Sequence, residues 1–402
     1  MLRSMQPMAP EELLRLGSWL LSVPLIAVLH ETGHALAARP AGYRVTSFGV
    51  GHGKPLVRWH HSSGAVVYLG RWIFSGGLCV AIPVDPVPER RWLYHSGGLL
   101  AQGVLALVLW PLASMLPILE YAFWFNLVVA GWNLLPLRLG GYATDGWQLF
   151  SGLWRCAAAG QFFGSREQVQ RVLGFEERVG SPLGQTWCRL SLRWMDIVTG
   201  MDDEGWVADE VLLMAEPRIE ALDAYTRAER HRVEGRSLAA IQVIQETRRA
   251  LGGDLGRLAS DMLVVAEARA WLALGEQRLA RQALARIAGA PGVVARDALA
   301  IELGAALLDE DVAEVERSGL RLSELLSRPL LDAPDAVRTL WEAARLLKER
   351  GRIEGAESLA IAARQQAGAL IREATPRDKV AVAARLGEVA GVEIQPPRRS
   401  AR

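Results

Sequence analysis

The feature that most restricts the fold is an apolar run long enough to cross a lipid bilayer. Residues 93–119 contain no Asp, Glu, Lys or Arg, and a helix of about 20 residues spans the hydrocarbon of a bilayer. Residues 16–38 form a second run, in which Glu31 is the one charged side chain besides two histidines, and residues 121–137 form a shorter third. Soluble core helices seldom run this long without a charge. We therefore expect three membrane spans.

The basic residues predict how these spans are oriented. Arginine and lysine dominate the segment between the first two spans and the segment after the third, at Arg39, Arg44, Lys54, Arg58, Arg71, Arg90, Arg91, Arg138, Arg155, Arg166 and Arg171. Such residues are retained on the cytoplasmic side of a membrane. We expect a multi-pass protein of the cell (inner) membrane, with the N-terminus and a hairpin turn at Glu120 outside and the C-terminal half in the cytoplasm.

Composition along the chain predicts four regions. Residues 1–160 would form the transmembrane core, 161–205 a linker with amphipathic helices, 206–390 a cytoplasmic α-helical domain and 391–402 a disordered tail. Within the core, residues 48–59 and 64–84 alternate β-branched and aromatic residues with glycine, which predicts short strands near the membrane surface. The expected fold class is therefore mainly α, with a polytopic membrane core and a small β element.

A recurrence in the C-terminal half predicts helical hairpins. Gly235, Gly275 and Gly351 are each followed five residues later by alanine, and a degenerate copy occupies residues 309–314. Glycine then alanine at this spacing is typical of the turn and the close-packing position of a helical repeat. The pattern resembles a divergent tetratricopeptide-like array, and an ordinary helical bundle is the alternative.

The first span ends on a motif that can bind a metal ion. His30 and His34 are four residues apart, so one helix face presents both imidazoles, while Glu31 lies beside them and can take a proton from a metal-bound water. Ionisable groups inside a span are costly unless they pair or function. The alternative is that these are helix-end residues whose polar tips reach the membrane interface.

Zinc needs a third protein ligand and an open position for water. The candidate is Asp145, which follows Asn133 and Pro136, where the proline ends the third span. A broken helix can turn a carboxylate back toward the first span, because irregular backbone is tolerated where it lines a polar cavity. The alternative role for Asp145 is that of an ordinary helix N-cap.

The sequence "HETGHALAA", followed two spans later by "NLLP" and "DG", resembles the site-2 protease family of intramembrane zinc metalloproteases. The resemblance covers about residues 15–155. It implies that His30, His34 and Asp145 bind one Zn²⁺, that Glu31 is the catalytic base, and that Asn133 and Gln102 contact substrate or the oxyanion. Gln102 stands where the family has an asparagine, and the loop from residue 137 to 144 is longer than in the family.

The expected function is that of an intramembrane zinc metalloendopeptidase, which hydrolyses peptide bonds of membrane-anchored substrates. Its expected partners are a transmembrane protein or peptide substrate, the lipid bilayer and a cytoplasmic protein bound by the helical domain. The net charge of +1 gives no reason to expect nucleic acid. Two alternatives are a catalytically silent, membrane-tethered interaction scaffold and a soluble zinc peptidase. Two histidines and an aspartate also accept other divalent ions.

Overall fold

The structure is a computed structural model that describes residues 10–83, 91–139, 142–153, 166–199, 217–252, 255, 257–287, 292–326, 334–374 and 376–390. The chain is mainly helical. It divides into two compact units: unit 1 is Met1–Ala157 with Gly174–Gln185, and unit 2 is Ala158–Leu173 with Thr186–Arg402. Part of the predicted linker thus groups with the core. The predicted disordered tail, 391–402, lies outside the described residues.

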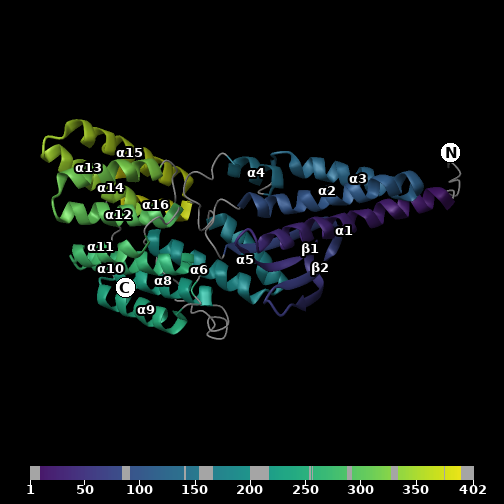
Figure 1. Cartoon of the computed structure of the whole chain (residues 1–402), viewed down its shortest axis with the longest axis horizontal. Helices are drawn as coiled ribbons and strands as arrows, with labels where there is room; N and C mark the ends of the chain where they lie inside the picture. The colour runs from purple at the N-terminus through teal and green to yellow at the C-terminus, as the bar shows by residue number, and fades with distance from the viewer. Residues whose placement is uncertain are drawn as a thin grey trace. The chain divides into compact units, whose positions relative to one another are not determined.

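Three helices form the frame of unit 1. They are α1 (Pro10–Ala38), α2 (Arg91–Met115) and α3 (Pro117–Leu134), which lie side by side (Figure 1). In the described part of the chain, Glu12–Ala38 and Trp92–Met115 are long and apolar enough to cross a membrane by length and composition. Helix α3 is not among these candidates, so the third span stays a prediction.

The turn between α2 and α3 differs from the prediction. We expected the second apolar run to continue as far as Leu119 and turn at Glu120. Instead α2 ends at Met115 and α3 begins at Pro117, which places Glu120 in the first turn of α3. Proline suits the first helical position, because its fixed φ is already helical and its missing N–H would have no partner there. The predicted turn position was therefore wrong.

A two-stranded antiparallel sheet lies between α1 and α2 in the chain, where strands were predicted, but its strands have 18 residues each and are not short. Strand β1 (Tyr43–His60) pairs with β2 (Val66–Pro83) in a register that sets Val50 opposite Gly77 and Phe48 opposite Cys79. The sheet packs on α1. Where it meets the helices, Ala38, Ala41, Cys79 and Tyr94 form a buried cluster, and the Tyr94 hydroxyl donates to the Cys79 carbonyl at 2.7 Å. The sheet is thereby fixed to both helices.

The sheet is also held by the last turns of α5 (Arg166–Val179), which belong to unit 1. Thr46 Oγ1 and Ser47 Oγ on β1 donate to Glu176 Oε1 at 2.7 and 3.0 Å. Ser181, just before α6 (Pro182–Thr199), donates to the Thr46 carbonyl at 3.0 Å. Burial raises the pKa of Glu176 despite these hydrogen bonds. A carboxyl group in the core of unit 1 therefore anchors β1.

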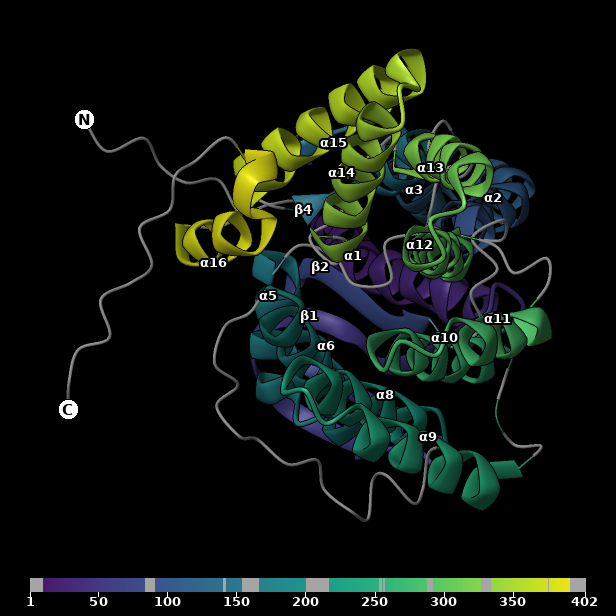
Figure 2. The same cartoon turned by 90° about the vertical axis from the view of Figure 1, so that its left-hand side faces the viewer.

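Unit 2 consists largely of successive helices: α8 (Pro217–Val233), α9 (Ser237–Leu251), α10 (Arg257–Ala273), α11 (Gln277–Leu284), α12 (Gly292–Leu308), α13 (Val312–Leu325), α14 (Pro334–Glu349), α15 (Ile353–Glu373) and α16 (Pro376–Leu386). From α8 to α15 they pair as helical hairpins that follow one another along the unit (Figure 2). A continuous core of Leu, Ala and Val runs through the hairpins formed by α12 to α15.

The predicted recurrence coincides with the turns of these hairpins. At each turn one residue has positive φ, namely Gly235 at 78°, Gly275 at 78°, Glu310 at 53° and Gly351 at 76°. The residue five positions later is buried in every case: Ala240, Ala280, Val315 and Ala356. The degenerate copy makes the same turn without glycine but one residue later than predicted, because Glu310 and Val315, rather than Asp309 and Glu314, take the turn and buried positions. Its classification as tetratricopeptide-like stays a prediction.

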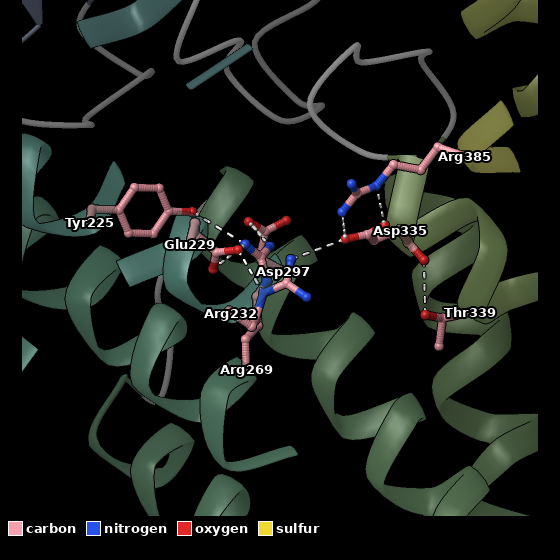
Figure 3. A network of polar contacts seen from close by, with 8 residues as sticks. All are labelled: Tyr225, Glu229, Arg232, Arg269, Asp297, Asp335, Thr339 and Arg385. Carbon is pink, nitrogen blue, oxygen red and sulfur yellow. Dashed lines mark hydrogen bonds and ion pairs between the residues drawn. The ribbon is translucent and has the colours of Figure 1, made fainter. Parts of the chain in front are cut away.

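A network of charged side chains joins helices α8, α10, α12, α14 and α16 of unit 2 (Figure 3). Arg269 contacts Glu229 at 3.2 Å and Asp297 at 2.6 Å. Asp335 accepts from Arg232 at 3.2 Å and from Arg385 at 2.9 Å. Since Arg232 lies on α8 and Asp335 on α14, this network links the first hairpin to the last.

Candidate metal centre

Three potential ligand atoms converge where α1 meets the start of α4 (Asp145–Leu153). His30 Nε2 lies 3.0 Å from Asp145 Oδ2 and 3.1 Å from His34 Nε2. His34 Nε2 lies 3.3 Å from the same carboxylate oxygen. His30 and His34 are buried, and the Asp145 side chain is 14% exposed. Residues more than a hundred positions apart in sequence thus form one compact cluster.

The spacing of these atoms fits a metal ion with tetrahedral geometry. Ligand atoms about 2.0–2.1 Å from a tetrahedral ion are separated from one another by about 3.3 Å. The three separations of 3.0, 3.1 and 3.3 Å are close to this value. Two imidazoles and a carboxylate are also a donor set that accepts divalent first-row ions. These residues could therefore hold a metal ion through three ligands.

Both imidazoles are oriented so that Nε2 points to the centre. Gln102 Oε1 lies 2.9 Å from His30 Nδ1, and the Tyr94 carbonyl oxygen lies 2.8 Å from His34 Nδ1. A carbonyl oxygen can only accept, so the hydrogen of each neutral imidazole resides on Nδ1 and the lone pair on Nε2. Metal-binding histidines commonly have such a partner for their second nitrogen. The surroundings of both rings thus favour metal binding.

Thr144 brings Asp145 to the cluster. The Trp147 amide donates to Thr144 Oγ1 at 3.3 Å, so Thr144, and not Asp145, is the N-cap of α4. The same hydroxyl accepts from the Leu137 amide at 3.1 Å. A short hairpin of β3 (Arg138–Leu139) and β4 (Tyr142–Ala143) precedes it. The alternative role of Asp145 as the cap is therefore wrong, and its carboxylate is free to face the histidines.

Glycines make the space in which the imidazoles sit. A methyl group added at Gly98 on α2 would lie 2.4 Å from His30 Cε1 and 2.6 Å from His34 Nε2. Where α1 crosses α2, a methyl group at Gly33 would lie 2.2 Å from the Gly97 carbonyl oxygen. Such close approach of two helices is possible only without side chains. The glycines of "HETGH" and "HSGG" therefore shape the site.

Glu31 is adjacent to the cluster and contacts the sheet. Its side chain is buried, and a methyl group added at Gly77 on β2 would lie 2.5 Å from Glu31 Cγ and 3.1 Å from Oε1. Glu31 directly follows His30 on the helix, so its side chain points to one side of the face that carries the two histidines. Its carboxylate therefore lies beside the three ligand atoms and is not one of them. This arrangement leaves a carboxylate next to the metal centre, where it can accept a proton.

The two amide residues proposed from the resemblance differ in their placement. Gln102 contacts His30, as described above, whereas no contact described by the structure joins Asn133 to the ligand cluster. Asn133 lies in the last turn of α3 and is half-buried. Sequence reasoning missed Asn126, whose Nδ2 donates to the Gln102 carbonyl at 2.9 Å. An asparagine within an otherwise apolar helix was the signal that could have identified it.

Cys79 lies close to Glu31 but is not part of the ligand cluster. Burial, with the nearby charge of Glu31, raises the pKa of the Cys79 thiol to about 12. Among the described residues, the metal-ligating group that the fold assembles is His30, His34 and Asp145.

Comparison with known proteins supports this interpretation of unit 1. No curated protein and no solved structure matches the chain. Residues 18–117 match the family model of Peptidase family M50, a stretch that includes His30, Glu31, His34 and Gln102 and ends before Asp145. With the two candidate spans, the match indicates a membrane protein with a peptidase core that resembles the M50 metalloproteases.

Proposed function

We propose that this protein is an intramembrane zinc metalloendopeptidase that hydrolyses peptide bonds of membrane-anchored substrates. The observation that carries the proposal is the convergence of His30, His34 and Asp145 at the separations of a tetrahedral site, with both histidines on a helix apolar enough to cross a membrane. The family match over residues 18–117 supports a peptidase. One Zn²⁺ per chain would be held by these three side chains.

Zinc held by His30, His34 and Asp145 would supply a water molecule of lowered pKa and would polarise the substrate carbonyl. The chain supplies the proton transfers. The Glu31 carboxylate accepts the proton of the attacking water and returns it to the amine that leaves. The burial of Glu31 beside Gly77 holds the carboxylate in place and limits its access to bulk water.

The substrate must present an extended peptide at this centre, because a helix hides its peptide bonds in its own hydrogen bonds. The sheet of β1 and β2 offers a template, since an extended segment can add to a strand edge. Gly77 of β2 already contacts Glu31, so a segment paired along this sheet would pass near the base. Asn133, at the end of α3, is a candidate substrate contact.

We place the protein in the inner membrane as a multi-pass protein, with unit 2 in the cytoplasm. The positive residues that flank the candidate spans support this orientation. The recurring turns of unit 2, with a small or β-branched residue buried five positions later, support a tetratricopeptide-like array. Such an array presents an extended surface that would recruit a cytoplasmic protein partner.

The test is metal analysis and a peptidase assay on the full chain purified in detergent, with a membrane-spanning peptide as substrate. Wild type should contain about one zinc per chain and cleave the peptide. Glu31→Gln should keep the zinc and lose cleavage by at least about 10²-fold. Asp145→Ala should lose both.

Glu120→Gln is the matched control, because it changes a glutamate at the start of α3 that has no part in the proposed centre. It should behave as wild type. Cleavage that persists in Glu31→Gln would refute the assignment of the base. A wild type that binds zinc but cleaves no membrane-spanning peptide would favour the silent scaffold.

A further inference from the structure

We propose that Gln102 and Asn126 are positioning residues that hold the His30 imidazole in the tautomer and orientation needed for metal binding. The inference rests on the proposed zinc site and concerns side chains that do not touch the ion. Gln102 lies on α2 and Asn126 on α3, and both are fully buried. Together with His30 on α1 they link the three long helices of unit 1.

The first step is the contact between Gln102 and His30. Gln102 Oε1 lies 2.9 Å from His30 Nδ1, so the amide oxygen requires the hydrogen to be on Nδ1. The lone pair of Nε2 then faces His34 and Asp145. The opposite orientation of the amide would present its NH₂ group to Nδ1 and move the hydrogen to Nε2. His30 would then have no lone pair for a metal ion.

The second step is the contact that fixes the backbone of Gln102. Asn126 Nδ2 donates to the Gln102 carbonyl oxygen at 2.9 Å. This hydrogen bond joins α3 to α2 at the residue from which the Gln102 side chain reaches His30. We expect Asn126 to limit the movement of Gln102, and to influence His30 only through it.

The third step is the cost of burying these two amides. Gln102 Nε2 and Asn126 Oδ1 are buried and have no hydrogen-bond partner among the described residues. An unsatisfied polar group in an apolar environment lowers stability, so an apolar side chain of similar size would suit this packing better. Fold stability therefore does not explain why two amides are buried at these positions, whereas the need to orient the His30 imidazole does.

The difference between the two explanations can be measured. The experiment uses the full chain in detergent and measures the zinc dissociation constant by competition with a chromophoric chelator. It also measures the unfolding temperature of the metal-free protein. Gln102→Met preserves the size of the side chain but removes the acceptor. Its zinc affinity should fall by about 10- to 100-fold, while the metal-free unfolding temperature should stay the same or rise.

Three further variants make the result specific. Gln102→Glu retains an acceptor for Nδ1–H and should keep zinc affinity within a few fold of wild type. Asn126→Leu should weaken zinc binding, by less than Gln102→Met does. Glu120→Gln changes a polar side chain in the first turn of α3, away from Gln102, and should leave zinc affinity unchanged.

Two results would overturn the inference. The first is a Gln102→Met variant that binds zinc as tightly as wild type, which would leave the proposed metal site intact. The second is a Gln102→Met protein that loses zinc affinity but also unfolds several degrees earlier without metal, while Gln102→Glu loses as much affinity, which would make Gln102 a structural residue. A wild type that binds no zinc would overturn both this inference and the proposed function.

Discussion

Units 1 and 2 both bury polar side chains, but they satisfy them in different ways. In unit 2 each carboxylate of the charged network faces an arginine: Asp297 and Glu229, which are buried, contact Arg269, and Asp335 contacts Arg232 and Arg385. In unit 1, His30 Nε2, His34 Nε2 and Asp145 Oδ2 face one another at 3.0 to 3.3 Å. The first arrangement is complete within the protein, whereas the second brings together atoms that can each donate a lone pair.

The difference separates a structural network from a functional one. Buried ion pairs hold helices in register when every charge has a partner. Converging lone pairs repel one another unless a proton or a cation lies between them, and the hydrogens of both imidazoles are directed away, to Gln102 and to the Tyr94 carbonyl. The comparison therefore indicates that unit 1 is where a cation could bind, whereas the charged network of unit 2 is complete within the protein.

Among the changes that test this comparison, substitution of Gly98 should have the largest effect on zinc affinity. Gly98→Ala places a methyl group within 2.6 Å of His34 Nε2 and still closer to His30. We expect zinc affinity to fall by at least about 100-fold, since the imidazoles must leave their positions. Gly103→Ala is the control, because outside its own helix backbone and chain neighbours no described atom lies within 4 Å of a methyl group there. Wild-type zinc binding by Gly98→Ala would show that the site is not packed as described.

The next expected effect is a loss of stability in unit 2, with no change in zinc binding by unit 1. Arg269→Met leaves Asp297 and Glu229 without this partner, and breaking a buried ion pair costs about 3 kcal/mol or more. Calorimetry should show destabilisation of the full chain with unchanged zinc stoichiometry. Arg236→Met, whose exposed side chain pairs with Glu234, should change stability little. Loss of zinc in Arg269→Met would contradict the separation of the two networks.

A smaller effect is expected at the cap that presents Asp145. Thr144→Val removes the acceptor for the Trp147 and Leu137 amides, which should cost about 1 kcal/mol of stability and weaken zinc binding several-fold by loosening Asp145. Thr32→Val is matched to it, because Thr32 lies within the motif and its hydroxyl, in the described part of the chain, donates to the Val28 carbonyl of its own helix. Equal zinc affinities for the two variants would argue against a role for the cap.

The smallest effect is a pH dependence in unit 2. Burial opposes ionisation of Asp335. The hydrogen bond and charge of Arg385, together with the charges of Arg232 and Arg269, outweigh this effect and lower the pKa of Asp335 from 3.8 to about 2. The stability that the Asp335 carboxylate contributes to the fold is therefore present above about pH 4 and is lost as pH falls toward 2. Because the side chain is half-exposed, we expect only about 1 kcal/mol.

The measurement for Asp335 is urea unfolding of wild type and Asp335→Asn across this range. The stability difference should be largest near neutral pH and should shrink as pH falls from about 4 to 2. A difference that stays constant with pH would mean that the carboxylate charge contributes nothing.

The sequence predicted local features better than long-range contacts. Apolar length predicted α1 and α2, alternation predicted β1 and β2, and the spacing of His30 and His34 predicted two imidazoles on one face. Proximity of Asp145 to them followed from the proline break and the family resemblance. The start of α3 at Pro117 was missed, because proline was not considered as a helix start within an apolar run.

Two features depended on packing that no local pattern encodes. The contact of Gln102 with His30 and its support by Asn126 need the register of three helices. In unit 2, Asp297 and Arg269 look in sequence like residues of a solvated helix face, and their burial follows only from the stacking of hairpins (Figure 3).

X-ray absorption at the zinc edge of the purified full chain tests the central claim most directly. The account predicts one zinc per chain, surrounded by two imidazole nitrogens and by oxygen, at about 2.0–2.1 Å. In Asp145→Ala the zinc signal should be lost. Zinc ligated by sulfur at about 2.3 Å, or a spectrum that Asp145→Ala leaves unchanged, would contradict the metal centre of His30, His34 and Asp145.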